Sequence, residues 1–253
     1  MGDFFNVTFL AILQGVAEFL PISSSGHLVI GQHVLSVDDP GMRLDVFLHV
    51  GTLLSIMVYY RRTILRIVAG ADVRYMSKIA LSALPAVLVY AIFREKIESM
   101  FENAKAVGLL LVFTGAVLSG TRFLPKGTKD VTFLRALWMG AMQAVAILPG
   151  VSRSGMTLAA ARSAGVEPSK SAEFSFLMSA PLIAGGMVLE IAKIFRGGAD
   201  EGVGMGLLAW GTVLSAAVGY FSLVVLVKAL KGRWFWLFGP YCIIAGLLVV
   251  CFL

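Results

Sequence analysis

Long apolar runs constrain this chain more strongly than any other feature of its sequence. Six stretches are apolar enough and long enough to cross the roughly 30 Å of hydrocarbon in a bilayer. They are residues 44–60, 78–93, 106–121, 172–189, 203–227 and 234–253. Because 58% of the residues are hydrophobic and only 14% are charged, one soluble core could not hide this much apolar surface. The sequence therefore predicts an all-α polytopic membrane protein, with residues 1–253 as a single integral membrane domain.

Two further apolar regions, residues 5–35 and 134–164, do not have the pattern of ordinary spanning helices. Proline, glycine and several hydroxyl residues interrupt each region near its middle, at residues 21–26 and 149–155. In lipid, irregular backbone is tolerated only where protein or a water-filled cavity surrounds it. We therefore expect each region to form a re-entrant helical hairpin whose turn faces a polar cavity.

The two interrupted regions belong to an internal repeat. A shift of about 129 positions superimposes Gln14 on Gln143, Val16 on Val145, Ala17 on Ala146, Ser23 on Ser152, Ser25 on Ser154 and Gly26 on Gly155. Repeat 1 covers about 1–125 and repeat 2 about 129–253, and each contains one hairpin followed by three spans. Because three is an odd number, the second half should enter the membrane from the opposite side, as an inverted-topology repeat. The turns of the two hairpins should then meet in one central site.

The basic residues predict the orientation of the spans. If the spans alternate sides, residues 61–78, 122–135 and 228–233 share one side and hold 12 Lys and Arg. The opposite loops, 94–105 and 193–201, carry five basic residues against five acidic ones. By the positive-inside rule the first group is cytoplasmic. Both termini and the active-site opening should then lie on the periplasmic or extracellular side of a bacterial inner membrane. The basic residues behind the formal charge of +6 are therefore expected to orient the chain in the lipid membrane, and no nucleic acid partner is expected.

Polar residues of distinct chemistry surround the first break. Gln14 and Glu18 are four residues apart and share one face of a helix. A carboxylate within a membrane usually has a cation, a proton or an arginine as its partner, so Glu18 is a functional candidate. If Ser24 opens the next helix, His27 lies one turn later, within reach of the Ser24 hydroxyl as a general base. The plainer interpretation is a helix cap followed by an interfacial histidine.

The second break places an arginine among small hydroxyl residues. An intramembrane arginine needs an anion, and the planar fork of Arg153 matches two phosphate oxygens. The hydroxyls and helix N-termini around it are typical of a phosphate cradle. A structural salt bridge between Arg153 and Glu18 is the alternative.

The remaining polar positions carry weaker signals. His49 is isolated in an apolar helix and is expected to be a packing residue, and Glu173 should cap a helix or support a neighbour. Cys242 and Cys251 lie in the last apolar span and predict neither a disulfide nor a metal cluster. The N-terminal residues lack a basic region and a cleavage site, so we expect them to be mature protein. Five glycines are expected to permit close helix packing: Gly108, Gly115, Gly120, Gly185 and Gly186.

The motifs together resemble a known family. Residues 14–21 read QGVAEFLP, residues 23–27 read SSSGH and residues 149–155 read PGVSRSG. These segments, followed by EFSFL at 173–177 and by Pro181, are similar to the bacitracin-resistance family of undecaprenyl diphosphate phosphatases. The resemblance extends over essentially the whole chain, in length, number of spans and order of motifs.

The resemblance implies hydrolysis of undecaprenyl diphosphate to undecaprenyl phosphate and inorganic phosphate, which recycles the lipid carrier for cell-wall synthesis. It also implies a divalent cation, Mg²⁺ or Ca²⁺, with Glu18 and Gln14 as its ligands. The family pattern allows Glu or Gln at position 14. Because this chain has Gln14, Glu18 is the only carboxylate of the motif. The catalytic residues implied are Ser24, His27, Glu18 and Arg153. The residues implied to bind phosphate are Ser23, Ser25, Gly26, Ser152, Ser154, Gly155 and Thr157.

Several mechanisms and one other function class stay open from the sequence. Ser24 could attack the terminal phosphorus while His27 takes its proton, or His27 could itself be the nucleophile. A secondary transporter or lipid flippase would have the same inverted-repeat fold without needing a nucleophile. A structural scaffold would leave the clustered charges unexplained, and a homodimer is left open as an assembly.

Overall fold

The computed structural model describes residues 2–35, 37, 43–101, 103–197, 203–232 and 234–252, and these form helices joined by short turns. The helices are α1 (Gly2–Ala17), α2 (Ser24–Leu35), α3 (Arg43–Tyr59), α4 (Arg61–Val68), α5 (Val73–Met100), α6 (Ala104–Gly120), α7 (Phe133–Val145), α8 (Arg153–Ser163), α9 (Pro168–Gly197), α10 (Met205–Lys231) and α11 (Phe238–Phe252). Two short 3₁₀ turns, Thr121–Phe123 and Phe235–Leu237, precede α7 and α11. Among the described residues the only bridge of β type joins Lys129 and Val166. The all-α prediction is confirmed.

Five helical segments among the described residues are long and apolar enough to cross a membrane. They are Val73–Ile97, Ala104–Phe123, Pro168–Val188, Met205–Lys231 and Phe235–Phe252. The sixth expected span, residues 44–60, coincides with α3, which has 17 residues. That helix is shorter than each of these five segments and is not among them. The last expected span ends at residue 253, just outside the described residues.

The outer surface is apolar, as expected for a protein solvated by lipid. Large hydrophobic side chains on α5, α10 and α11 point outward, including Leu88, Ile92, Phe221, Ile244 and Leu248. In water such a surface would be costly, at roughly 25 cal/mol for each Å² of apolar area. The chain is therefore an integral membrane protein.

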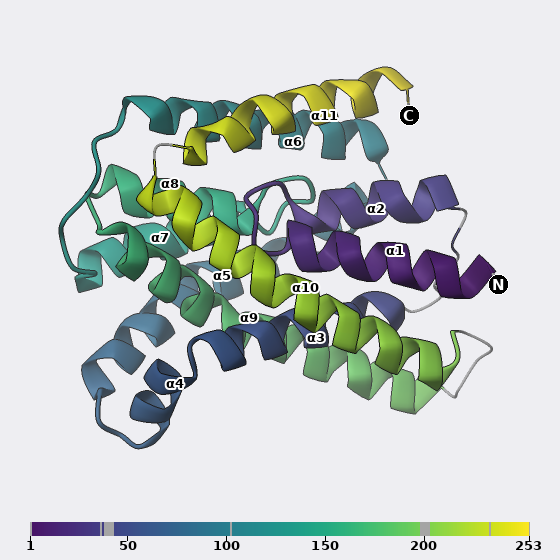
Figure 1. Ribbon diagram of the computed structural model, residues 1–253, viewed down its shortest axis with the longest axis horizontal. Coiled ribbons are helices and arrows are strands. Elements are labelled where there is room, and N and C mark those ends of the chain that lie inside the picture. Colours follow the sequence, from purple (N-terminus) through teal and green to yellow (C-terminus); the bar gives the residue numbers. More distant parts are fainter. Residues whose placement is uncertain are drawn as a thin grey trace.

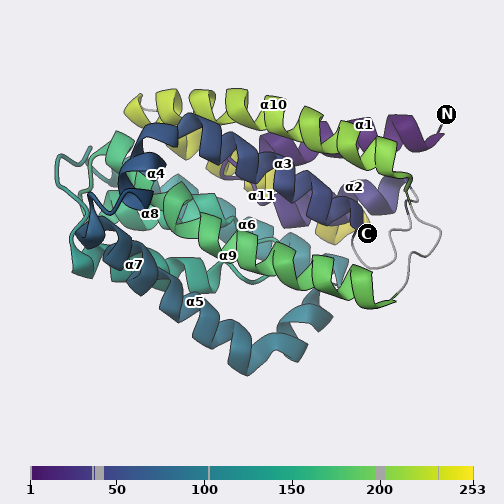
Figure 2. The same cartoon turned by 90° about the horizontal axis from the view of Figure 1, so that it is seen from below.

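Two helical hairpins meet near the centre of the molecule. Helices α1 and α2 pack together and come from the end where α1 begins and α11 ends, whereas α7 and α8 come from the opposite end (Figure 1). Their two turns face each other between the long helices. Helix α6 lies beside α11, and α3 lies beside α10 and α9, which encloses the turns on several sides (Figures 1 and 2).

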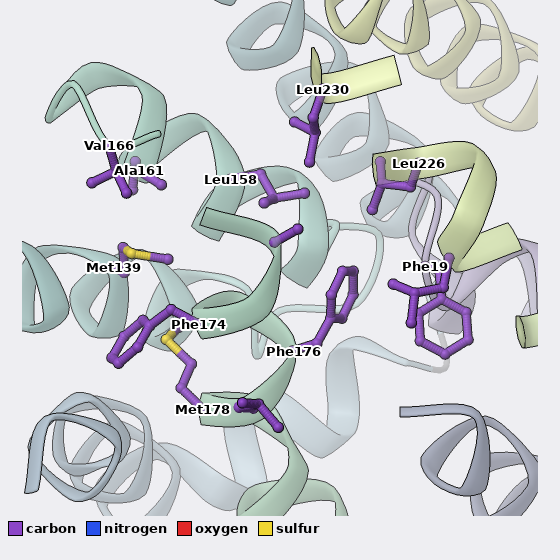
Figure 3. Close-up of a cluster of buried hydrophobic side chains, with 14 of the residues drawn as sticks. Phe19, Met139, Leu158, Ala161, Val166, Phe174, Phe176, Met178, Leu226 and Leu230 are labelled. Carbon is purple, nitrogen blue, oxygen red and sulfur yellow. The ribbon is translucent and has the colours of Figure 1, made fainter. Parts of the chain in front are cut away.

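The hydrophobic core anchors both turns. Phe19, in the α1–α2 turn, is fully buried and packs edge-on against Phe176 of α9, with ring centroids 5.3 Å apart (Figure 3). Leu158 of α8 and Leu226 of α10 belong to the same cluster. Because Phe19 directly follows Glu18, its burial fixes the position of the carboxylate.

Glycines bring α6 and α11 into close contact. A Cβ atom on Gly108 would lie 2.9 Å from the Gly246 carbonyl oxygen, and one on Gly115 would lie 2.6 Å from the Gly239 carbonyl oxygen. The packing role predicted for Gly108 and Gly115 is therefore confirmed. It is wrong for Gly120, Gly185 and Gly186, where a Cβ atom would meet nothing within 4 Å.

Candidate functional site

The turn between α1 and α2 presents the polar residues of the first break. Ser23 has a φ of +70°, an uncommon conformation for a residue other than glycine. In this conformation its hydroxyl accepts a hydrogen bond from the Gly26 amide at 3.4 Å, and its carbonyl accepts one from the His27 amide at 3.1 Å. Ser23 thus begins α2 and places Ser24 at its first position.

The turn between α7 and α8 is held by α6. Gly150 has a φ of +90°, and a Cβ atom there would lie 2.3 Å from the Val107 carbonyl oxygen, so only glycine fits. The Thr114 hydroxyl donates to the Gly150 carbonyl at 3.1 Å and accepts from the Ser152 amide at 3.1 Å. Ser152 then caps α8 by accepting from the Gly155 amide at 3.1 Å. Arg153 is therefore the first residue of α8, directed by a fixed turn.

Glu18 is the centre of the site. Its buried carboxylate forms an ion pair with Arg153, which lies 135 residues later in the chain. The Ser24 hydroxyl donates to Glu18 Oε2 at 2.7 Å, and Gln14 Nε2 donates to the same oxygen at 3.1 Å. The structure thus brings together the first and second broken segments, as the repeat predicts.

His49 also belongs to this cluster. Its Nε2 atom lies 3.7 Å from Glu18 Oε2, and its Nδ1–H donates to the Asp45 carbonyl at 2.7 Å. His49 was expected to be a packing residue, and this expectation did not include the contact with the carboxylate, which arises because α3 packs against α1. A lone histidine gives no sequence signal for this contact.

His27 has different partners from those expected. Its Nδ1–H donates to the Ser23 carbonyl at 2.9 Å, and its Nε2 accepts from the Tyr241 hydroxyl at 2.8 Å. The two rings are also stacked, with an angle of 12° between their planes. The prediction that Ser24 contacts His27 is wrong, because the Ser24 hydroxyl donates to Glu18 instead. Tyr241 lies on α11, 214 residues from His27, and no motif in the sequence marks it as a site residue.

The other candidate phosphate ligands mainly hold the two turns together. Ser152 and Ser154 share a hydrogen bond at 3.3 Å, and Ser154 donates to the Leu20 carbonyl across the hairpin interface at 3.3 Å. Thr157 donates to the Arg153 carbonyl and pairs with the Ser175 hydroxyl at 2.6 Å. Ser25, partly exposed, lies 3.4 Å from the Ser23 hydroxyl. Of these hydroxyls, that of Ser25 is the most accessible.

Two buried polar atoms of the site have no partner among the residues that the structure describes. Arg153 Nη1 is a donor without an acceptor, and Gln14 Oε1 is an acceptor without a donor. Leaving such atoms buried and unpaired costs about 1–3 kcal/mol each, so both indicate places where a ligand completes the site. An anion suits Arg153 Nη1, whereas a cation or a donor suits Gln14 Oε1.

The donor set fits a divalent cation shared with a phosphate ligand. Glu18 offers a carboxylate and Gln14, whose Nε2 lies on that carboxylate, offers an unpaired Oε1; Mg²⁺ commonly uses one or two carboxylates together with substrate phosphates and water. Within the described residues, no group of three or more His, Cys, Asp or Glu side chains could hold a metal alone. Any cation here would therefore need oxygen atoms from the bound substrate.

Known proteins match this chain along nearly its whole length. A family model described as bacitracin resistance protein BacA matches residues 7–248. An undecaprenyl-diphosphatase of Desulforapulum autotrophicum is 36% identical over 265 residues, covering 95% of each chain. Undecaprenyl-diphosphatase 4 of Bacillus thuringiensis subsp. konkukian is 34% identical over 244 residues, covering 95% of this chain and 94% of its own. An undecaprenyl-diphosphatase of Halothermothrix orenii is 33% identical over 253 residues, covering 98% and 97%.

Proposed function

Because this chain belongs to the bacitracin resistance protein BacA family, we propose that it hydrolyses undecaprenyl diphosphate to undecaprenyl phosphate and inorganic phosphate. This reaction recycles the lipid carrier for cell-wall synthesis and gives bacitracin resistance. The observation that carries the proposal is the Glu18 carboxylate, which contacts both Arg153, a guanidinium with a free donor, and the Ser24 hydroxyl. In phosphoryl transfer Arg153 would bind phosphate, Glu18 would act as the base and Ser24 as the nucleophile.

The contacts of Glu18 suggest how the hydroxyl is activated. Arg153 Nη1, the donor left unpaired, binds an oxygen of the substrate diphosphate, while Arg153 Nη2 stays on Glu18 Oε1. Glu18 then accepts the proton of Ser24 as the hydroxyl oxygen attacks the terminal phosphorus. The bond from that phosphorus to the bridging oxygen breaks, undecaprenyl phosphate leaves, and water releases phosphate from the serine.

His27 has two possible roles in this scheme. With Nδ1–H held by the Ser23 carbonyl, Nε2 keeps a lone pair, directed to Tyr241. Through Nε2 it would protonate the leaving group or attack phosphorus in place of Ser24. Trapping the phosphorylated enzyme and treating it with acid separates the two, because phosphohistidine is labile in acid and phosphoserine is stable. Acid-stable label on Ser24 is the expected outcome, and an acid-labile adduct would assign attack to His27.

Phosphate release by the purified protein tests the function. In detergent micelles no gradient exists, so an enzyme works there and a transporter does not. We expect metal-dependent release of phosphate from undecaprenyl diphosphate. If the pure protein released none under any cation tested, the transporter or flippase alternative would take its place.

We also propose that Gln14 Oε1 and Glu18 hold the divalent cation, Mg²⁺ or Ca²⁺. When bound, the cation would neutralise charge on the diphosphate and favour the departure of undecaprenyl phosphate. The unpaired Gln14 Oε1 supports the assignment, since it is the one acceptor in the cluster with no donor.

The substitution Gln14→Glu tests the cation site. A second carboxylate should lower the Mg²⁺ concentration for half-maximal activity by about tenfold, or roughly 1.4 kcal/mol of binding. Titrating activity against Mg²⁺ measures this shift. Gln143 is the equivalent residue of the second half and is also buried, so Gln143→Glu is the matched control. An equal shift in both variants, or none in Gln14→Glu, contradicts the assignment.

We propose that the two hairpins are re-entrant and that the halves form inverted-topology repeats, with both termini on the periplasmic side. The supporting features are the opposite directions of the hairpins and the basic residues gathered in the loops at one end. The active site would then open towards substrate in the outer leaflet.

Cysteine labelling in intact cells tests this orientation. In a background with Cys242 and Cys251 replaced by alanine, a membrane-impermeant maleimide should label Asn103→Cys in intact cells. It should label Ala71→Cys only after lysis. Both positions are exposed turns, at opposite ends of α5. The reverse pattern would place the termini in the cytoplasm.

A further inference from the structure

A second polar cavity lies at the end of the molecule away from the termini. It has a volume of about 400 Å³, within the range of small-molecule sites. Its walls come from the junction of α3 and α4, the first turns of α9 and the last turns of α10. None of the residues around Glu18 line it, so it is separate from the catalytic cluster.

The mouth of this cavity is cationic. Arg61, Arg62 and Lys231 line it and are exposed. Arg61 donates to the Val58 carbonyl at 3.1 Å, and within the described residues none of the three cations has a carboxylate within ion-pair distance. Three cations at one mouth without an acidic partner form a site for an anionic group such as phosphate.

The floor of the cavity has the opposite charge. Glu173 is partly buried and accepts hydrogen bonds from the Thr63 hydroxyl at 3.3 Å and the Tyr75 hydroxyl at 3.4 Å. In the part of the chain that the structure describes, no Lys or Arg pairs with it. Tyr60, which also lines the cavity, is only 7% exposed, and its hydroxyl has no partner within the described ranges. The floor therefore has a partly buried carboxylate without a cationic partner beside a hydroxyl without a partner, and it can receive a cationic donor group.

We propose that this cavity binds the zwitterionic phosphoethanolamine headgroup of a membrane lipid. The phosphate lies at the mouth against Arg61, Arg62 and Lys231, and the ammonium reaches the Glu173 carboxylate. Basic pockets between transmembrane helices at the membrane surface are recurrent lipid headgroup sites. The carboxylate selects among lipids, because a headgroup without an amine leaves it unpaired and brings negative charge towards it.

Charge separation along the cavity is what distinguishes this ligand from free phosphate. Inorganic phosphate would use the three cations but would gain nothing from Glu173. An anionic lipid such as phosphatidylglycerol would also gain nothing from it. Removing the contact between the amine and Glu173 should therefore weaken the binding of phosphatidylethanolamine alone.

Native mass spectrometry of the full-length protein in detergent tests the proposal. The protein is titrated with phosphatidylethanolamine, with phosphatidylglycerol and with phosphatidylethanolamine in the presence of inorganic phosphate. Phosphatidylethanolamine should bind most tightly. The double variant Arg62→Gln, Lys231→Gln should bind both lipids about a hundredfold more weakly, about tenfold for each charge-assisted hydrogen bond that is lost.

Glu173→Gln is the decisive variant, and Lys129→Gln is its control. Glu173→Gln should weaken phosphatidylethanolamine binding about tenfold and leave phosphatidylglycerol binding unchanged. Lys129 is an exposed cation at the same end outside the cavity, so its replacement should change neither. Equal affinities for both lipids, insensitivity to Glu173→Gln, or displacement of the lipid by free phosphate would each overturn the proposal.

Phosphate release from undecaprenyl diphosphate separates this inference from the proposed function. Each cavity variant should keep its phosphatase rate, since the cavity is separate from the Glu18 cluster. Retained activity also shows that the variant is folded. A variant that loses both lipid binding and activity is replaced by Glu173→Asp, which keeps the charge and should keep lipid selectivity. Loss of that selectivity in Glu173→Asp overturns the proposal as well.

Discussion

Replacing Arg153 by lysine should reduce the rate of phosphate release by about 10³-fold, because an arginine that stabilises phosphoryl transfer contributes 10³ or more. Lysine keeps the charge but loses the planar fork, which in this site has one donor on Glu18 and another, Nη1, left for phosphate. A single ammonium cannot make both contacts. The measurement is the turnover of purified protein with undecaprenyl diphosphate at saturating Mg²⁺.

Arg162→Lys is the matched control for this experiment. Arg162 lies in the last turn of the same helix, α8, and donates to the Leu124 carbonyl at 3.0 Å without contacting Glu18. We expect this variant to stay within about threefold of the unmodified rate, since it makes no contact with the phosphate. Equal losses in both variants, or near-normal turnover of Arg153→Lys, would remove Arg153 from the mechanism.

The contact between Arg153 and Glu18 was predictable from the sequence because two independent patterns indicate it. An intramembrane carboxylate and an intramembrane arginine each need a partner, and the proposed inverted repeat would place their segments in facing turns. The glycine and proline breaks likewise mark both turns. Local patterns therefore predicted the two segments, and the proposed repeat predicted their contact.

Contacts that depend on helix packing were not predictable. His49 and Tyr241 reach the site from α3 and α11, and neither has a motif around it that would show this. The partner of Ser24 was misjudged for the same reason. Helical spacing places His27 near Ser24, but the His27 ring is hydrogen-bonded to the Ser23 carbonyl and the Tyr241 hydroxyl. The Ser24 hydroxyl is bound to Glu18, which the turn places beside it. Sequence spacing gives proximity along one helix and does not rank competing hydrogen-bond partners.

The substitution Glu18→Gln should reduce turnover by about 10³-fold, within the range of losses for a general base that also orients its neighbours. Glutamine keeps the size of the side chain but cannot take the Ser24 proton. The substitution also removes the negative charge that pairs with Arg153. The guanidinium then has no anionic partner until substrate binds. At saturating Mg²⁺, which offsets the weaker cation binding expected without the Glu18 charge, substrate affinity should change much less than turnover, since the diphosphate gives Arg153 a new partner.

A double variant distinguishes a base from a structural partner. If Glu18 acts through Ser24, Glu18→Gln combined with Ser24→Ala should be no slower than the slower single variant, because residues that act as one unit are strongly non-additive. If Glu18 only holds the fold, the two losses should multiply, and unfolding of Glu18→Gln in detergent should occur at a clearly lower temperature. The contact of 2.7 Å between the Ser24 hydroxyl and Glu18 favours the first result. Multiplicative losses would return the role of base to His27, whose Nε2 would then have to leave Tyr241 to reach Ser24.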